Sequence, residues 1–389
     1  MRILQLSNVQ HSDTPTSQIH LARALASRHA ILYVDTLGNR APGAGGKRDI
    51  AKVVRRLAAS THGPEHLGEG LWALAPLAIP GSTGMWTGLI DRVTLVAQVK
   101  AGLRRAGALP PDVVWVASPS SVRVARQFDV PVVYYCTDDT SAFPAVNARS
   151  VLTDEAEILA RAAAVVVVSD SLASVLKARG AKNVTVLENG VATALFEDPP
   201  QGAVEAAREL MGPHISGRKV AVLTGTLDDR TDLGVLDEVA RALPDVDFLI
   251  AGPRMPSLHG SLPQRDNIRY LGRVDHELAA GLVSQADVCI APYADTEVVR
   301  RSSPLKVMEY LASGTPVVAT DVVPLRPYVD VVQLAHSVRQ FSEAVRAALA
   351  VTDAKSAQAR RRRVSGMAWS AVAARFETVL ESVVAESGR

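Results

Sequence analysis

The sequence has little cysteine, no long hydrophobic run and almost no excess of charge, and each shortage excludes a class of protein. Only two cysteines occur in 389 residues, Cys136 and Cys289. We therefore expect buried free thiols rather than a disulfide framework. The longest apolar run, residues 162–168, is much shorter than the roughly 20 residues that cross a bilayer. The chain opens on a strand-like segment, so we expect no secretory signal. These features predict a cytoplasmic protein with no integral membrane segment, and leave a peripheral membrane contact through a helix open.

The balance of charge also narrows the partners. The net charge is +2, so no attraction to nucleic acid is predicted. A run of four arginines, residues 360–363, is interpreted as a solvated helix face. Hydrophobic residues make up 48% and charged residues 21%, which is typical of a globular protein. The length favours two domains.

Several motifs of other enzyme classes are missing or incomplete. No Gly-x-Gly-x-x-Gly follows the first strand, which argues against a nicotinamide dehydrogenase. The segment APGAGGKRD resembles a phosphate loop, but it lacks the first glycine and carries Arg48 where a magnesium-binding hydroxyl is needed. His62 and His66 have a spacing seen in zinc sites, yet a Gly-Pro pair between them disfavours a helix. We expect no metal and no cofactor.

Short runs rich in Val, Ile and Leu alternate with amphipathic stretches, and this rhythm runs twice along the chain. Such a pattern indicates βαβ units on parallel sheets. A polar, Pro- and Gly-rich break at residues 197–217 separates the two repeats. We predict an α/β protein with Rossmann-like domains at 1–196 and 215–365. Residues 366–389 are predicted to form a C-terminal helix that packs back towards the first domain.

Ligands bind beyond the carboxyl ends of the strands in open α/β sheets. Two such domains are either two separate nucleotide binders or two halves of one site. If they face each other, their functional loops share a cleft.

The segment SSPLKVMEYLASGTPVVAT is the most informative for chemistry. Ser303 and Pro304 suit the cap and first position of a helix that ends at Gly314. The positive end of this helix and Lys306 in its first turn form an anion site suited to a diphosphate. Glu309 lies deeper in the helix, where a carboxylate can accept hydrogen bonds from ribose hydroxyls. An ordinary capped helix with Glu309 paired to a surface arginine is the alternative.

These residues carry a resemblance. PLKVMEYLASGTPVVAT, the preceding DNIRYLGRVDHELAAGLVSQADVCIAPY, and VVVVSDSLASVLKARGAKNVTVLENGVATALF in the first half resemble glycosyltransferase family 4, the "group 1" glycosyltransferases with the glycosyltransferase-B fold. The early part of the chain is closer to a divergent branch of this family. The resemblance implies two Rossmann-like domains facing across a cleft and a nucleoside diphosphate sugar, with UDP or GDP, as donor.

The resemblance also implies roles for residues of the second domain. Glu309 matches the second of the family's two glutamates and would bind the ribose. The first falls on Arg301, so the family's contact with the donor sugar is not matched there and a phosphate contact is favoured instead; Glu297 lies four residues away. Backbone groups and the loop that would contact the nucleotide base complete the donor-binding set. Its further members are Ser303, Pro304, Leu305, Gly225, Arg273 and Val274.

Two phosphate-binding cations of the family are replaced here by Thr226 and Thr231. Arg230 is adjacent and either supplies the missing charge or is a solvated loop residue. Lys306 is therefore the better candidate for stabilising the leaving diphosphate.

In the first domain the resemblance places a carboxylate beyond a middle strand, which gives Asp138 and Asp139. One of them would orient or deprotonate the acceptor, with Asp138 slightly favoured. The pair also suits the cap of the next helix. Thr16 and Ser17 occupy the loop that carries two glycines in the family, on the acceptor side.

The sequence thus predicts a glycosyltransferase that moves a sugar to a small-molecule or glycan acceptor, with retention of anomeric configuration as the family implies. Two alternatives stay open. One is a sugar-nucleotide epimerase or hydrolase on the same fold. The other is a non-catalytic nucleotide- or glycan-binding subunit, suggested by the altered positions Arg301, Thr226 and Thr231.

Overall fold

The computed structural model describes most of the chain as two compact units. Unit 1 comprises residues 1–188 and 372–389, and unit 2 comprises residues 189–371. The predicted phosphate-loop-like segment and His62 lie outside the described residues. The structure describes residues 1–11, 16–35, 63–76, 85–143, 146–212, 217–255, 258, 260–351 and 353–388, with the backbone alone for 85–93.

Unit 1 contains an eight-stranded sheet in the order β3-β4-β2-β1-β5-β6-β7-β8. All neighbours are parallel except β3 and β4. The strands are β1 (Arg2–Leu6), β2 (Ala30–Val34), β3 (Glu65–Gly68), β4 (Leu71–Leu74), β5 (Val113–Val116), β6 (Val132–Cys136), β7 (Ala162–Val167) and β8 (Val184–Val186). The helices are α1 (Ser17–Ala26), α3 (Met85–Arg105), α4 (Val122–Ala125), α5 (Ala148–Arg161), α6 (Asp170–Ala178) and most of α15 (Trp369–Ser387), with short 3₁₀ turns η1 (Pro119–Ser121) and η2 (Thr140–Ala142).

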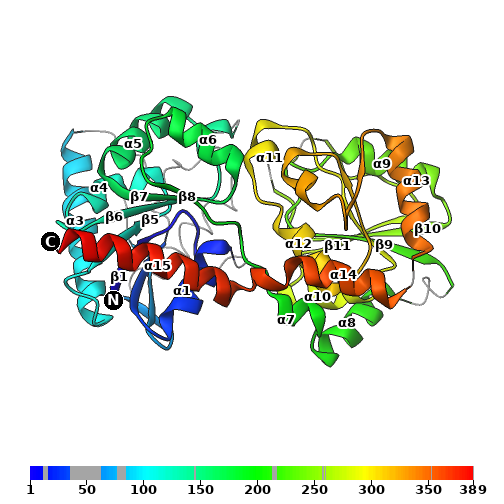
Figure 1. The fold of residues 1–389 in the computed structure, drawn as a ribbon, viewed down its shortest axis with the longest axis horizontal. Coiled ribbons are helices and arrows are strands. Elements are labelled where there is room, and N and C mark those ends of the chain that lie inside the picture. The colour runs from blue at the N-terminus through cyan, green and yellow to red at the C-terminus, as the bar shows by residue number, and fades with distance from the viewer. Residues whose placement is uncertain are drawn as a thin grey trace. The chain divides into compact units, whose positions relative to one another are not determined.

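The C-terminal helix α15 completes the core of unit 1 (Figure 1). Phe376 packs against Trp115 of β5, with ring centroids 4.8 Å apart, and against Tyr135 of β6, at 5.4 Å. All three side chains are fully buried. The residues of β5 and β6 are apolar on both faces of the sheet, because helices cover both faces of a parallel sheet. The predicted return of the last helix to the first domain is confirmed.

Unit 2 contains a six-stranded sheet in the order β11-β10-β9-β12-β13-β14, and all its pairs are parallel. Its strands are β9 (Lys219–Thr224), β10 (Val246–Ala251), β11 (Ile268–Gly272), β12 (Val288–Ala291), β13 (Val317–Thr320) and β14 (Gln333–Ala335). Its helices are α7 (Thr193–Glu197), α8 (Gln201–Met211), α9 (Leu233–Ala242), α10 (His276–Ser284), α11 (Glu297–Arg301), α12 (Leu305–Ser313), α13 (Val338–Leu349) and α14 (Ala354–Val364), with η4 (Val323–Tyr328) and η5 (Ser365–Met367).

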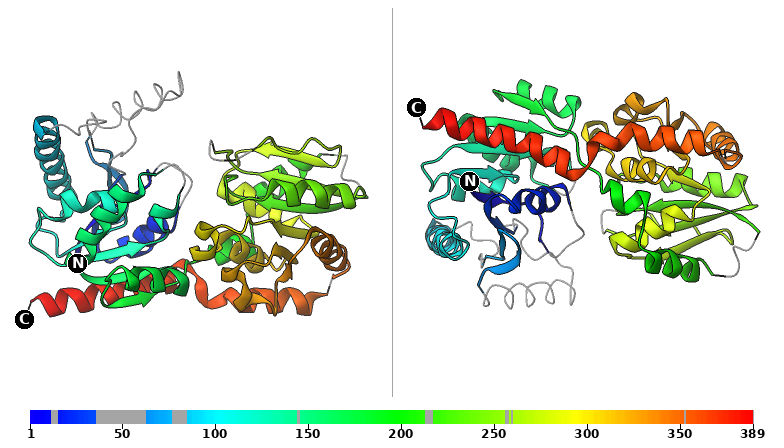
Figure 2. Two further views of the ribbon diagram at one scale, coloured as in Figure 1. Left: turned by 90° about the horizontal axis from the view of Figure 1, so that it is seen from above. Right: turned by 60° about the horizontal axis from the view of Figure 1, so that its bottom comes forward.

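Helices cover both faces of this second sheet as well, as the views in Figure 2 show. Alternate residues of β9 enter different cores: Val220 and Val222 pack in one, and Ala221 and Leu223 in the other. This division follows from the two-residue period of a strand. Each unit is therefore a Rossmann-like α/β layer structure, as predicted.

The division between the two compact units falls at Glu188/Asn189, and part of the Pro- and Gly-rich segment 197–217 forms the helix α8, which packs against α10. The interpretation of the arginine run as a solvated helix face needs correction. Arg360 is buried and donates to the Gly314 carbonyl oxygen at 2.8 Å, and Arg361 donates to that of Ser313 at 2.8 Å. These guanidinium groups satisfy the carbonyls at the end of α12.

Cys136 and Cys289 are buried free thiols, as expected. Burial raises the pKa of each. Among the described helices, none combines the length and the apolar character that crossing a bilayer requires.

Candidate functional site

The site predicted in the second half of the chain lies where the strand order of unit 2 reverses. From β9 the chain proceeds outward through β10 to β11, and from β12 it proceeds the opposite way through β13 to β14. The connections that follow β9 and β12 therefore lead in opposite directions along the sheet. In open α/β sheets, this divergence creates the crevice in which ligands bind.

Backbone contacts hold these two loops together. The loop after β9 forms an antiparallel bridge between Thr231 and Tyr293. Next to it, the Ala294 N–H donates to the Arg230 carbonyl oxygen at 2.9 Å. Thr231, which stands in place of a family cation, thus has a structural position in the wall of the site.

Glycines at adjacent strand ends let the backbones approach closely. A Cβ atom on Gly252, which follows β10, would lie 1.9 Å from the Gly225 carbonyl oxygen. Gly252 also has φ +151° and donates its N–H to Gly272 at 2.7 Å. Gly225, with φ +104°, leaves space on its other side, where a Cβ would be 3.3 Å from Lys306 Cε. The glycine therefore makes room for the lysine.

The helix that carries Lys306 begins one residue later than predicted. Pro304 is the residue before α12 rather than its first, and no side-chain oxygen caps the helix, so the prediction of Ser303 as the cap is wrong. The Leu305 N–H donates to the Ser303 carbonyl oxygen at 2.9 Å, and Pro304 has no N–H. Residues 303–305 therefore shape the entrance to the helix more than they supply donors. The helix ends at Gly314 in the left-handed conformation, as predicted.

Lys306 lies at the centre of the site. Its Nζ is 5.6 Å from the centroid of the Tyr293 ring, a cation–π arrangement. The residue is partly exposed, and its ammonium end lies beside the Tyr293 ring and Gly225. Burial of this group, with the charge of nearby Arg230, lowers its pKa to about 8, against the opposing charges of Asp228 and Glu309. An ammonium group whose pKa is lowered by burial is stabilised in its charged form when an anion binds beside it.

Arg230 reaches the same region but already has a partner. Its Nη2 is 2.6 Å from Asp228 Oδ2, and its Nε is 3.0 Å from both carboxylate oxygens. Asp228 is buried. Arg230 is therefore an ion-pair member near Lys306, and its side chain remains 35% exposed.

Glu309 pairs with a residue that the sequence analysis missed. His276 Nε2 is 2.8 Å from Glu309 Oε1, and the two side chains are 25% and 14% exposed. The alternative of a surface arginine partner is wrong. Burial of the His276 ring disfavours its protonation, but the hydrogen bond and charge of Glu309 outweigh this and raise its pKa. The sequence Asp-His-Glu does indicate a helix start, because Asp275 caps α10 and places His276 in its first turn.

Arg301 is engaged within its own short helix. It hydrogen-bonds Glu297, which also accepts from Arg300 at 3.0 Å. Glu297 is thus a salt-bridge partner for these arginines. In the loop after β11, Arg273 is exposed and Val274 packs against the core.

In unit 1 the two candidate aspartates differ sharply. Asp139 is buried, accepts from the N–H and hydroxyl of Ser141, and forms two hydrogen bonds with Arg179, at 2.9 and 3.1 Å. The capping alternative is the one that the structure shows for Asp139. Asp138 is partly exposed and accepts from Thr137 at 3.2 Å.

The acceptor-side residues lie at the start of α1. Thr16 precedes the helix without capping it, and Ser17 is buried in its first turn. The Thr16 hydroxyl is buried with no hydrogen-bond partner among the described residues.

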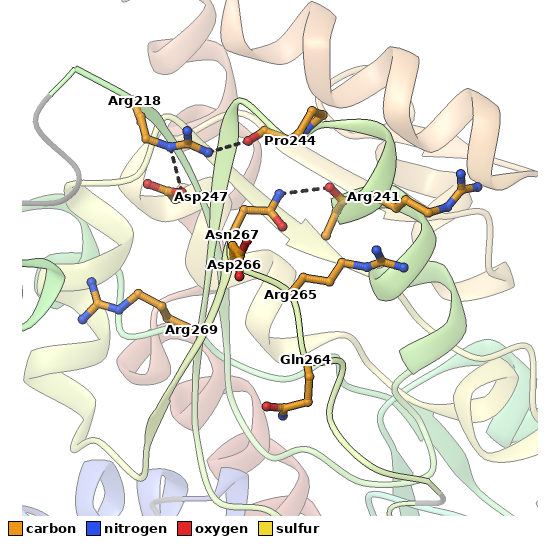
Figure 3. Close-up of a pocket in the computed structure, with 10 residues that line it drawn as sticks. Arg218, Arg241, Pro244, Asp247, Gln264, Arg265, Asp266, Asn267 and Arg269 are labelled. Carbon is orange, nitrogen blue, oxygen red and sulfur yellow. Dashed lines mark hydrogen bonds and ion pairs between the residues drawn. The ribbon is translucent and has the colours of Figure 1, made fainter.

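A cavity of about 700 Å³ in unit 2 lies away from these groups (Figure 3). Its lining comes from the amino ends of β9, β10 and β11, including Arg218, Asp247 and Asn267. Arg218 donates to Asp247 at 2.9 Å and to the Pro244 carbonyl oxygen at 2.6 Å. Its position opposite the carboxyl ends of the strands argues against it as the donor site.

Comparisons with known proteins follow the same division of the chain. The family model described as "Glycosyltransferase Family 4" matches residues 15–195, and that described as "Glycosyl transferases group 1" matches residues 218–350. TuaH of Bacillus subtilis, named as a teichuronic acid biosynthesis glycosyltransferase, is 26% identical over 53% of this chain and 55% of its own length. A phosphatidyl-myo-inositol mannosyltransferase of Mycobacterium leprae is 29% identical over 48% of this chain and 52% of its own. The chain thus spans about half the length of these relatives.

Solved structures share the fold at low identity. An α,α-trehalose 6-phosphate synthase of Burkholderia multivorans aligns with a TM-score of 0.67 and 14% identity, over 99% of each chain. Anabaena HepE, in complex with UDP and glucose, aligns with a TM-score of 0.65 and 14% identity, over 98% of this chain and all of that one (100%). These likenesses show the glycosyltransferase-B fold. The chain belongs to the glycosyltransferases that the two family models describe.

Proposed function

We propose that the protein transfers a sugar from a nucleoside diphosphate sugar to an acceptor, and that the donor binds at the strand-order reversal of unit 2. The observation that carries this proposal is the position of Lys306. An ammonium group with a lowered pKa stands in the first turn of a helix that no side chain caps, beside the loops that follow β9 and β12. Helix dipole, cation and glycine-lined backbone together fit a diphosphate.

The roles divide along the helix. Lys306 neutralises the charge that develops on the diphosphate as the bond to the sugar breaks. Glu309 lies one turn further on, where its second carboxylate oxygen can accept hydrogen bonds from the ribose while His276 holds the first. Arg230 adds positive potential beside Lys306. Because Thr226 and Thr231 replace the family's cations, Lys306 contributes most of the positive charge that faces the diphosphate.

The acceptor and the stereochemistry belong to the proposal as well. The relatives' names point to teichuronic acid in one case and to phosphatidyl-myo-inositol, a polyol lipid, in the other. We therefore propose a hydroxyl acceptor on a glycan or polyol, with retention of the anomeric configuration. UDP- and GDP-sugars are the donors to test first, because a fold relative holds UDP.

The test is a turnover panel of UDP- and GDP-sugars, each with and without polyol and glycan acceptors, read as nucleoside diphosphate release. The proposal predicts release that depends on acceptor, with a product whose anomeric proton coupling matches that of the donor. Equally fast release without acceptor would favour the epimerase or hydrolase alternative. Failure of the folded protein to bind UDP or GDP in calorimetry would contradict the proposal.

A further inference from the structure

In unit 2, the hydroxyl of Tyr310 makes all its hydrogen bonds to one residue at the end of β9. It accepts from the Thr224 N–H at 2.8 Å and from the Thr224 hydroxyl at 3.1 Å, and it donates to the Thr224 carbonyl oxygen at 3.3 Å. Tyr310 is 0% exposed and Thr224 is 3% exposed. A phenolic hydroxyl has one donor and two acceptor positions, so these three contacts use its full capacity.

The Thr224 N–H needs this partner because β12 no longer pairs with β9 at this level. Successive N–H groups of a strand point alternately to its two neighbours. The Gly225 N–H donates to the Ala251 carbonyl oxygen of β10 at 2.9 Å, so the Thr224 N–H points to the opposite side, towards β12. The pairing of β9 with β12 ends at Val222, two residues earlier. A buried N–H without an acceptor is costly, and the Tyr310 hydroxyl supplies the acceptor.

Tyr310 thereby connects the end of β9 to the helix that carries Lys306. The two residues are four positions apart on α12, so they lie on the same face of the helix. The Lys306 side chain lies against Gly225, the residue that follows Thr224, because a Cβ atom on Gly225 would be 3.3 Å from Lys306 Cε. The Tyr310 hydroxyl therefore sets the distance between Lys306 and the Gly225 backbone.

Several other contacts hold the carboxyl end of α12. The Thr315 hydroxyl donates to a carbonyl oxygen of α10 at 3.1 Å, and Arg360 and Arg361 donate to the carbonyls at the end of the helix. The amino end has no side-chain cap. A contact in the body of the helix is therefore needed to hold Lys306, in the first turn, at a fixed depth, and Tyr310 makes one.

We propose that Tyr310 is a positioning residue for the diphosphate, which holds Lys306 and the Gly225 backbone at the separation that the phosphates require. This inference rests on the proposed donor site. Because its side chain is fully buried, Tyr310 acts through Lys306 and not by contact with the ligand. Ligand-binding groups have to be held within about 0.5 Å of their productive positions. Glu309 has separate support from His276, so a loosened helix should weaken the diphosphate contact more than the ribose contact.

The test compares the affinity for a nucleoside diphosphate with the affinity for its nucleoside. Tyr310→Phe removes the hydroxyl and keeps the ring. The variant should bind UDP or GDP about tenfold more weakly, the size expected for one lost hydrogen bond, and uridine or guanosine within about twofold of the unsubstituted protein. Isothermal titration measures the diphosphate, and its displacement measures the nucleoside. Equal losses of both affinities would overturn the proposal.

Tyr134→Phe is the matched control. Tyr134 of β6 is 1% exposed and donates to Glu155 at 2.9 Å, so the substitution removes a hydrogen bond of a buried tyrosine in unit 1. It should lower stability in chemical denaturation about as much as Tyr310→Phe does, and keep UDP or GDP affinity within about twofold. Equal weakening of nucleotide binding in the two variants would reveal a general loss of stability and overturn the proposal.

A double substitution tests whether Tyr310 acts through Lys306. Tyr310→Phe should weaken UDP or GDP binding little further once Lys306 is replaced by alanine. Full additivity of the two substitutions would overturn the proposal. Thr224→Val removes only the side-chain contact, so it should weaken diphosphate binding about twofold and leave nucleoside binding unchanged. This variant carries the same comparison if Tyr310→Phe does not fold.

Binding by the unsubstituted protein separates this inference from the proposed function. Absence of UDP or GDP binding there would overturn the proposed donor site, and this inference with it. Binding that weakens in Lys306→Ala but stays unchanged in Tyr310→Phe would overturn this inference alone.

Discussion

The two sheets reverse their strand order in similar ways but present opposite chemistry at the reversal. In unit 2, Lys306 is a cation without a direct carboxylate contact among those described, and burial lowers its pKa to about 8. In unit 1, His11 is flanked by Asp35 and Glu65, and its pKa is raised. A bound anion would stabilise the charged form of the lysine, whereas the histidine already has its anions within the protein.

The backbones around these groups are fixed by different means. Unit 2 uses glycine: Gly225 and Gly252 let adjacent strand ends meet and leave room for Lys306. Unit 1 uses side chains: Ser7, Gln18 and Tyr33 tie down the loop after β1. Glycine packing leaves peptide groups close to a ligand, which suits a diphosphate. The side-chain network instead holds the loop that leads to His11.

Gly252→Ala should have the largest effect of the substitutions below, because it disrupts the close contact between Gly252 and Gly225 in unit 2. The new Cβ would meet the Gly225 carbonyl oxygen at 1.9 Å, at a φ that disfavours alanine. We expect a loss of about 4 kcal/mol in the free energy of unfolding, from strain and overpacking together. Chemical denaturation measures it.

Gly260→Ala is the matched control, because its φ is +83° but no atom lies within 4 Å of its new Cβ. It should cost only about 1 kcal/mol. Equal losses in both variants would mean that the contact between Gly252 and Gly225 has no importance of its own.

Lys306→Ala should weaken nucleoside diphosphate binding by about 100-fold, because charge-assisted contacts contribute about 1.5–3 kcal/mol each. Isothermal titration with UDP or GDP measures the dissociation constant. Lys355→Ala, an exposed lysine on α14, is the control and should bind normally. Unchanged affinity in Lys306→Ala would remove the contrast between the two units.

Glu309→Gln should reduce the preference for ribose over 2′-deoxyribose nucleotides by about tenfold. A carboxylate accepts hydrogen bonds from ribose hydroxyls more strongly than an amide does. Competition binding of UDP and 2′-deoxy-UDP measures this ratio. The exposed Glu277→Gln on α10 should keep it. An unaltered ratio in Glu309→Gln would place the ribose elsewhere.

His276→Ala should have the smallest effect, about threefold on the same ribose preference, because it acts by holding Glu309. The two substitutions should therefore be non-additive: His276→Ala should change little once Glu309 is glutamine. His336→Ala, an exposed histidine paired with Asp321, serves as the control. Full additivity would show that His276 acts independently of Glu309.

The sequence predicts what depends on neighbouring residues and misses what depends on distant ones. Gly314 ends its helix, and Lys306 and Glu309 share one helix, because spacing along a helix is local. The contact of His276 with Glu309 joins residues 33 positions apart, and no periodicity reveals it. The same holds for Arg360, which binds the carbonyl of Gly314 across 46 positions.

The start of α12 shows a second limit of prediction from the sequence. A serine before a proline suits a capped helix start, yet no side chain caps α12 and Pro304 takes the position before it. The Ser303 carbonyl oxygen, rather than its hydroxyl, accepts a hydrogen bond there, from the Leu305 N–H. In unit 1, no sequence pattern indicates the contact of His11 with Asp35, because the two residues follow different strands.

Proton uptake on nucleotide binding tests the central claim most directly. At pH 8.5, a lysine with a pKa of about 8 is mostly neutral, and a diphosphate beside it restores the ammonium form. Calorimetry in two buffers of different ionisation enthalpy should show an uptake of roughly three quarters of a proton per UDP or GDP bound, absent in Lys306→Ala. Tight binding without any proton uptake would contradict the assignment of Lys306 to the diphosphate.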